Sequence, residues 1–234
     1  MILSMLNNRI AKASNPVSPS AREQLAHSVI VRATAIAILL ATMFCSVDLT
    51  AATAQTSAKD ATQEFVNQAL QILRDKQKSV QQKRRDLKPL MEARFDATEM
   101  ARSTLGYHWR SLTLEQRADF TRTFTAFIEA AYLDKVQDYS GQEVRFGQSR
   151  SIGHGYDEVD TTIVQGGQNP IPVTYLLEQT SNGWKVYDVH VDNISIIANY
   201  RNQFNRVINE QGFPKLMADL RAKEQQLGSE LGQG

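Results

Sequence analysis

Apolar and polar positions divide most of the chain into a helical first half, a strand-rich middle and a helical end. Apolar side chains recur at spacings of three and four residues between Phe65 and Leu73, which predicts an amphipathic helix over about residues 58–78. A short helix is expected over residues 87–94, with Pro89 in its first turn. The first part of the chain is therefore predicted to be helical.

Two capping boxes mark further helix starts, at residues 96–99 (DATE) and 113–116 (TLEQ). In such boxes, polar side chains accept hydrogen bonds from the free amides of the first helical turn. Gly106 is placed to end the first of these helices, and the second is predicted to run to about Tyr139. Its apolar stripe consists of Phe120, Phe124, Phe127, Ile128, Ala131 and Tyr132.

Strict alternation of apolar and polar residues predicts antiparallel strands after the turn Ser140-Gly141. Two strands are expected around Val144 and around Val159. The other two form a hairpin, in which residues 173–180 and 184–191 are joined by Ser181-Asn182-Gly183. A three-residue loop with Gly in the left-handed conformation is a favoured hairpin connection.

The hairpin loop fixes which residues lie opposite each other. The predicted pairs are Thr180 with Trp184, Leu177 with Tyr187, Tyr175 with Val189, and Val173 with Val191. Because side chains alternate between the two faces of a strand, one face of the hairpin is apolar and aromatic. The other face, which includes Val186, Asp188 and His190, is mixed.

The chain returns to helix over about residues 194–208, with Ile197, Tyr200 and Phe204 on one side. Gly212 and Pro214 predict a break before a last helix that ends near Gln225. Residues 228–234 have no apolar pattern and are expected to be disordered. Helices segregated from a meander of four antiparallel strands define an α+β fold.

The first 54 residues have the order of features found in secretory signal peptides. Positive charges up to Arg32 precede an uncharged apolar run over residues 33–47, and residues 52–54 (ATA) form a small-x-small cleavage site. A transmembrane anchor is the alternative, but the run is shorter than the ~20 residues that span a bilayer. We therefore expect a signal peptide over residues 1–54 and one exported domain over residues 55–227.

Charge and cysteine content exclude several classes of function. Residues 55–234 keep 22 basic and 23 acidic residues, and this nearly neutral balance gives no support to nucleic-acid binding. Lys83, Arg84 and Arg85 form a basic cluster that we interpret as a solvated face, with contact to lipid headgroups as the alternative. The only cysteine, Cys45, lies in the predicted signal peptide, so the exported chain needs no disulfide.

The sequence contains no catalytic motif that we can identify. His108, His154 and His190 lack the spacing of metal ligands, and no Gly-rich phosphate loop or nucleophile elbow occurs. Asp188 and His190 can share one face of a strand, which leaves a small enzyme acting on an apolar substrate as a hypothesis. Tyr187 can join them only if a bulge intervenes.

Apolar and aromatic residues are abundant on the faces that turn inward. They either fill a core or line an apolar cavity that binds a small ligand, and composition does not decide between the two.

Several segments, taken in order, resemble the MlaC family of periplasmic phospholipid-binding proteins (the toluene-tolerance auxiliary component). The resemblance covers about residues 60–225, and order and spacing together make it specific. The segments are 95–102 (FDATEMAR), 105–110 (LGYHWR), 115–124, 139–141 (YSG), 183–189 (GWKVYDV), 195–201 (SIIANYR) and 203–204 (QF).

This resemblance implies a strongly twisted four-stranded sheet that is covered by helices around an apolar cavity, with an NTF2-like shape. Family members carry phospholipid between an outer-membrane lipoprotein complex and an inner-membrane ABC transporter with an MCE-domain protein, which maintains outer-membrane lipid asymmetry. A hopanoid-associated subgroup leaves that lipid class open as cargo. No cofactor or metal is implied, and we expect a monomer.

Combining the resemblance with the residue patterns gives a predicted cavity. Its sheet wall would be Val173, Tyr175, Leu177, Tyr187, Val189 and Val191. The long helix would face this wall with Phe120, Phe124, Phe127 and Ile128, and Ile197, Tyr200 and Phe204 would close one side. A lipid carrier is therefore the leading hypothesis; an apolar-substrate enzyme and an adaptor that bridges membrane complexes without binding lipid remain alternatives.

Overall fold

The computed structural model describes residues 56–232. The predicted signal peptide, its cleavage site and Cys45 lie outside the described residues. Among the residues that are described, no helix has both the length and the apolar character needed to cross a bilayer.

Two helices open the described part of the chain, α1 (Ala58–Arg74) and α2 (Val80–Arg94). The second helix begins at Val80, earlier than the predicted start at residue 87. Pro89 therefore lies inside α2 and not in its first turn. The true start is fixed by a capping box in which Ser79 and Gln82 exchange side chain to backbone hydrogen bonds of 3.2 and 2.8 Å. This start was missed because the first turns of α2 carry no apolar stripe.

Both predicted capping boxes mark helix starts. Asp96 accepts a 2.7 Å hydrogen bond from the Glu99 amide at the start of α3 (Ala97–Leu105), which ends at Gly106 with φ 55°. The short α4 (His108–Ser111) follows. Thr113 and Gln116 cap α5 (Leu114–Leu133) reciprocally. The chain then tightens into the 3₁₀ helix η1 (Asp134–Asp138), so the α-helix stops before the predicted end at Tyr139.

The strands form one antiparallel sheet in the order β1-β2-β3-β4-β5. It has five strands where four were predicted, because Ile194–Ser195 pairs with the end of β4 before the next helix begins. The strands are β1 (Glu143–Gly153), β2 (Tyr156–Val164), β3 (Ile171–Thr180), β4 (Gly183–Val191) and β5 (Ile194–Ser195).

Two of the four residue pairs predicted for the β3–β4 hairpin occur in the structure, and two do not. Val173 lies opposite Val191 and Tyr175 opposite Val189, but Leu177 pairs with Val186 and Gln179 with Trp184. The turn closes one residue tighter, with Thr180 opposite Gly183, and a bulge between Val186 and Asp188 compensates. Val186 therefore takes the core position that was predicted for Tyr187, and its side chain is fully buried.

The bulge also redirects Tyr187. Its ring centroid lies 5.6 Å from that of Tyr156, and Tyr156 lies opposite Glu178, on the face of the sheet that does not carry Leu177. A bulge inserts one residue and so reverses the alternation of side chains beyond it. The prediction that Tyr187 belongs to the same face as Tyr175 is therefore wrong.

Two helices end the chain, α6 (Ile196–Gln211) and α7 (Phe213–Gly232), with Gly212 at φ 84° between them. The break at Gly212 is as predicted. The last helix continues past Gln225, so helical backbone occupies most of the segment that was expected to be disordered.

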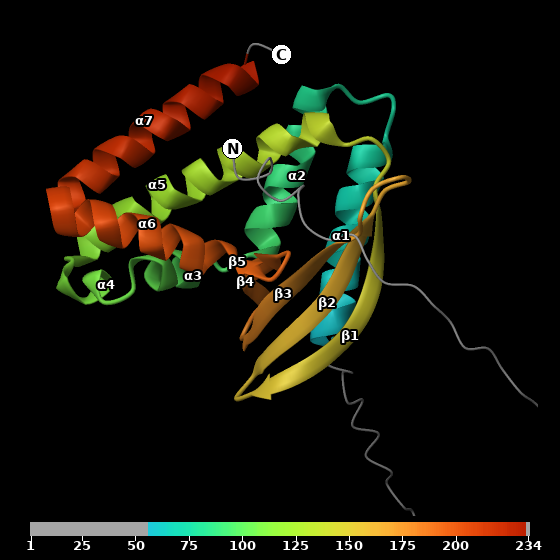
Figure 1. The fold of residues 1–234 in the computed structure, drawn as a ribbon, viewed down its shortest axis with the longest axis horizontal. Coiled ribbons are helices and arrows are strands. Elements are labelled where there is room, and N and C mark those ends of the chain that lie inside the picture. The colour runs from blue at the N-terminus through green and yellow to red at the C-terminus, as the bar shows by residue number, and fades with distance from the viewer. Residues whose placement is uncertain (1–55, 233–234) are drawn as a thin grey trace, which may run out of the picture. The chain divides into compact units, whose positions relative to one another are not determined.

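Among residues 56–232, buried apolar residues gather in three clusters, and Figure 1 labels the helices and strands that carry them. The helical cluster, formed by α3, α5, α6 and α7, comprises Met100, Ala101, Leu105, Phe120, Phe124, Phe127, Ile128, Ile197, Phe204, Leu216, Met217 and Leu220. The sheet cluster, between the sheet and α1, comprises Ala58, Val159, Leu177 and Val186. The third joins α2 to the end of α5 and to η1 through Leu87, Leu133 and Val136.

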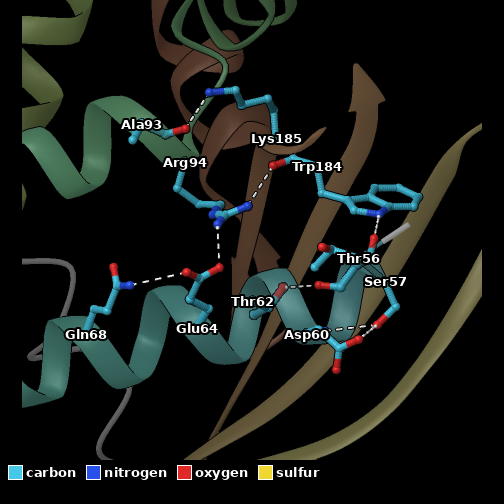
Figure 2. Close-up of polar contacts among 11 residues, drawn as sticks. Thr56, Ser57, Asp60, Thr62, Glu64, Gln68, Ala93, Arg94, Trp184 and Lys185 are labelled. Atoms are coloured by element: carbon cyan, nitrogen blue, oxygen red, sulfur yellow. Dashed lines mark hydrogen bonds and ion pairs between the residues drawn. The ribbon is translucent and has the colours of Figure 1, made fainter. Parts of the chain in front are cut away.

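Polar contacts fix α1 and the end of α2 to β4, as Figure 2 shows. The Arg94 guanidinium donates a 3.0 Å hydrogen bond to the Trp184 carbonyl and lies 3.7 Å from the Glu64 carboxylate of α1. The Trp184 indole donates to the Thr56 carbonyl at 2.8 Å, and Lys185 donates to the Ala93 carbonyl. These bonds hold α1 across the sheet.

Strand β1 is one edge of the sheet, and it is irregular. Its pairing with β2 shifts between Phe146 and Ser149 and again between Ser151 and Gly153. Lys59 of α1 donates a 2.9 Å hydrogen bond to the Gly147 carbonyl at the first of these shifts.

The predicted solvated face at residues 83–85 is only partly exposed. Arg84 is buried, and its Nε donates a 3.1 Å hydrogen bond to the Leu133 carbonyl at the end of α5. Lys83 donates to the Leu73 carbonyl at the end of α1 at 2.6 Å. These side chains satisfy carbonyls at helix ends, a role that an apolar–polar pattern does not reveal.

Replacing Arg84 with Ala should lower the free energy of unfolding by about 1–3 kcal/mol, because a buried carbonyl loses its donor. The matched control is Arg85→Ala, at an exposed position on the same helix, where a change within about 0.5 kcal/mol is expected. Urea denaturation of both variants measures the difference. Equal effects would contradict a bridging role for Arg84.

Candidate lipid-binding site

The helix side of the predicted cavity is assembled as one apolar cluster. Phe120 and Phe124 stack with ring centroids 5.6 Å apart, and Phe204 of α6 lies edge-on to both rings. Phe127 lies edge-on to Tyr200 at 5.6 Å. The seven residues predicted for α5 and α6 are therefore brought together, and α7 packs over them through Leu216, Met217 and Leu220.

The sheet side of the prediction is a separate cluster. Leu177 is fully buried with Val159 and Val186 beneath α1, and Tyr175 and Val189 pack against this group while remaining half-buried. Val173 is buried and Val191 half-buried. The predicted helix and sheet walls thus belong to two clusters, and α5 packs mainly on α7 and α3. Phe95 contacts both clusters.

Half-buried residues from the two walls define what we name the seam: Tyr175, Val189 and Val191 from the sheet, and Tyr200 from α6. Burial raises the pKa of Tyr175 to about 12, and it also raises the pKa of Tyr200. These phenols stay neutral at physiological pH, so the seam presents hydroxyl groups and aromatic faces without charge.

Tyr132 on α5 is a seam residue that the predicted wall omitted. Its side chain is 39% exposed, yet burial raises the pKa of its hydroxyl, and nearby Tyr200 and Asp188 raise it further. Tyr132 therefore lies near Tyr200 of the seam. Its place in the apolar stripe of the long helix was the signal that could have identified it.

Asp188 joins the sheet to the helices. One carboxylate oxygen accepts hydrogen bonds from the Val189 amide at 2.8 Å and the Ile197 amide at 3.2 Å, and the other accepts from the Ser195 hydroxyl. His190 Nε2 lies 3.4 Å from the same carboxylate. Asp188 therefore caps the first turn of α6, a structural task that its place in a strand did not suggest.

Two surface hollows are lined mostly by polar residues. One shallow hollow on α1 is lined by Asn67, Leu70, Gln71, Arg74 and Asp75. A second lies between α5 and α7 and is lined by Asp119, Arg122, Thr123, Ala126, Arg221, Glu224 and Gln225. Within residues 56–232, no three His, Cys, Asp or Glu side chains are grouped so as to hold a metal ion.

The sequence profile of the MlaC protein family matches residues 63–222, which is more than half of the chain. This chain belongs to the MlaC family. Its match to the intermembrane phospholipid transport system binding protein MlaC of Haemophilus influenzae is 25% identical over 147 residues, which are 61% of this chain and 67% of the relative.

The fold is shared with a solved phospholipid-binding protein. The phospholipid-binding protein of Ralstonia solanacearum, determined in complex with a phospholipid, superposes with a TM-score of 0.66 at 22% identity. The match covers 74% of this chain and 99% of that protein. At this identity the likeness shows the fold, and it confirms the predicted α+β class.

The segments that resemble MlaC proteins make the joint between sheet and helices in this chain. Asp96 and Ser195 cap α3 and α6, and Phe95 lies between the two clusters. Arg201 of α6 donates a 2.6 Å hydrogen bond to the Ser103 carbonyl at the end of α3. These residues fix how the two walls meet.

Replacing Asp188 with Ala should lower the free energy of unfolding by about 1–3 kcal/mol, because two amides and a hydroxyl lose their acceptor. Asp188→Asn keeps one oxygen for the Ile197 amide and should retain most of the stability. Thermal and urea unfolding of the pair measure the effect. A fully stable Ala variant would show that the carboxylate does not hold α6.

Proposed function

We propose that this MlaC-family protein is a phospholipid carrier that holds acyl chains between its helical and sheet clusters. The observation that carries the proposal is the family membership, because the Haemophilus relative is named as the binding protein of an intermembrane phospholipid transport system. The fold neighbour from Ralstonia was determined with a phospholipid bound, which supports the same cargo.

The seam is the place where acyl chains would lie. Its residues Tyr175, Val189, Val191, Tyr200 and Tyr132 are apolar or aromatic, and each keeps part of its surface free. The buried side chains of the two clusters pack beneath them. Cargo would part the clusters along the seam, and the predicted lining residues on both walls would then face the lipid.

Burial of acyl chains would favour a loaded protein over lipid that is exposed to water. At ~0.8 kcal/mol per methylene, a chain of about 15 methylenes gains roughly 12 kcal/mol when it leaves water. Each large core side chain that loses its packing costs roughly 2–5 kcal/mol, so this gain would offset the displacement of a few such side chains.

The wider transport role follows from the resemblance to the family. We propose that residues 1–54 direct export to the periplasm. There a single copy of the protein would carry lipid between an outer-membrane lipoprotein complex and an inner-membrane ABC transporter with an MCE-domain protein. This traffic would maintain the lipid asymmetry of the outer membrane, with hopanoids as the alternative cargo.

The two other hypotheses have weaker support. An enzyme that uses Asp188 and His190 would need a carboxylate that is free to react, whereas Asp188 is engaged at the start of α6. An adaptor without cargo would have a packed interior, so lipid has to be detected directly.

Protein purified from a bacterial periplasm should retain lipid at close to one molecule per chain. Mass spectrometry of an organic extract would identify its class and separate phospholipid from hopanoid. A folded protein that neither co-purifies with lipid nor takes it up from vesicles would sink the carrier proposal and leave the adaptor.

Enlarging the half-buried Val189 to Trp should block lipid loading at little cost in stability, because the new ring occupies the seam. The control is Val186→Trp on the same strand, which is fully buried and should lose about 1–3 kcal/mol through overpacking. Lipid content and thermal midpoint are measured for both variants. Normal lipid content in the Val189 variant, with a sharply lowered thermal midpoint, would show that Val189 belongs to the packed core and not to the seam.

Val173 also belongs to the predicted sheet wall, but its side chain is only 4% exposed. Val173→Trp should therefore destabilise the protein as the Val186 control does.

A further inference from the structure

Positive charge is concentrated at one end of the helical pair α1–α2. Residues 74–88 contain seven Lys or Arg and two Asp, whereas the whole of residues 55–234 is nearly neutral. We name residues 74–88 the basic turn. The remainder of the described chain is correspondingly acidic, so the protein is polarised in charge.

Some of these charges have structural tasks. Lys78 pairs with Asp86 at 2.7 Å, and Lys83 and Arg84 bond to carbonyls at the ends of α1 and α5. Lys76 and Arg85 are exposed, and neither forms an ion pair within residues 56–232. Their charges are available to a partner.

The basic turn also exposes an apolar residue. Val80, the first residue of α2, keeps 37% of its surface in solvent. It follows the helix-capping Ser79 and lies between the two unpaired cations in sequence. An exposed aliphatic side chain surrounded by Lys and Arg is typical of surfaces that meet anionic bilayers, where charge attracts the protein and the apolar group enters the interface.

The turn lies next to the seam. Arg84 bonds to the carbonyl of Leu133, the residue that follows Tyr132, and Arg74 donates to the Tyr139 hydroxyl beyond η1. In Figure 1 the start of α2 lies beside the end of α5. A surface that touched the basic turn would therefore stand close to one end of the seam.

We propose that the basic turn docks on the surface of an anionic phospholipid bilayer, with Lys76 and Arg85 facing headgroups and Val80 entering the interface. The proposal rests on the carrier function, since docking would bring the seam to the lipid that it loads or releases. Each Lys or Arg at such a surface strengthens binding by about fivefold. The attraction should weaken steeply with salt.

The experiment measures sedimentation of the purified protein with sucrose-loaded vesicles of phosphatidylcholine containing about 30 mol % phosphatidylglycerol. Binding is expected at about 50 mM NaCl, and loss of binding at about 500 mM NaCl or on pure phosphatidylcholine. The double variant Lys76→Glu with Arg85→Glu should bind at least tenfold more weakly. Val80→Ser should weaken binding without changing the charge.

The matched control is Arg206→Glu with Lys223→Glu, which makes the same change of charge at exposed positions of α6 and α7. It should bind as the parent does. Equal losses in both double variants would overturn the proposal, because only net charge would then matter. Absence of vesicle binding by the parent protein would also overturn the proposal, and an acidic protein would then be the partner to test for the basic turn.

Lipid content separates this proposal from the carrier function. The Lys76/Arg85 variant should keep its co-purified lipid, because neither side chain lies in the seam. Loss of that lipid would assign the two residues to cargo binding and overturn the docking role, while a parent protein that binds vesicles but carries no lipid would sink the carrier function alone.

Discussion

The hydrogen bonds of the Asp188 carboxylate set the relation between the sheet and the helices. Asp188 lies within β4, and the amides from which it accepts hydrogen bonds belong to β4 and to the first turn of α6. Because α6 carries Ile197, Tyr200 and Phe204, this side chain helps to set the position of the aromatic cluster relative to the sheet. The Arg201 hydrogen bond to the Ser103 carbonyl acts at the same joint. A buried carboxylate serves this purpose because it accepts several hydrogen bonds at once and is costly to leave without them.

This arrangement would suit the carrier function that we propose. The two clusters bury their own apolar surface, and the seam between them is half-buried. In a carrier, cargo would replace protein–protein contacts with protein–lipid contacts of the same apolar kind. Neutral tyrosines at the seam would meet acyl chains without exposing a charge to them.

Local signals in the sequence predicted most of the helices and strands. The capping boxes at Asp96 and Thr113 and the glycines that end helices act within a few residues, so a single sequence reveals them. The bulge at Tyr187 does not act locally, because it follows from fitting a tight turn to a register that the distant pairs of Val173 and Tyr175 also constrain. The same limit applies to the site: the apolar stripes predicted which residues turn inward, but not that α7 would cover α5.

The irregular edge strand β1 bears on how the protein behaves at high concentration. An exposed strand edge is a template onto which a second chain can add its own strand. In β1 the pairing with β2 is uninterrupted only from Glu143 to Phe146 and from Ser149 to Ser151. Between these stretches, the Lys59 ammonium group donates a hydrogen bond to the Gly147 carbonyl. Neither stretch is long enough to template a stable intermolecular sheet, so this edge is a poor seed for fibrils.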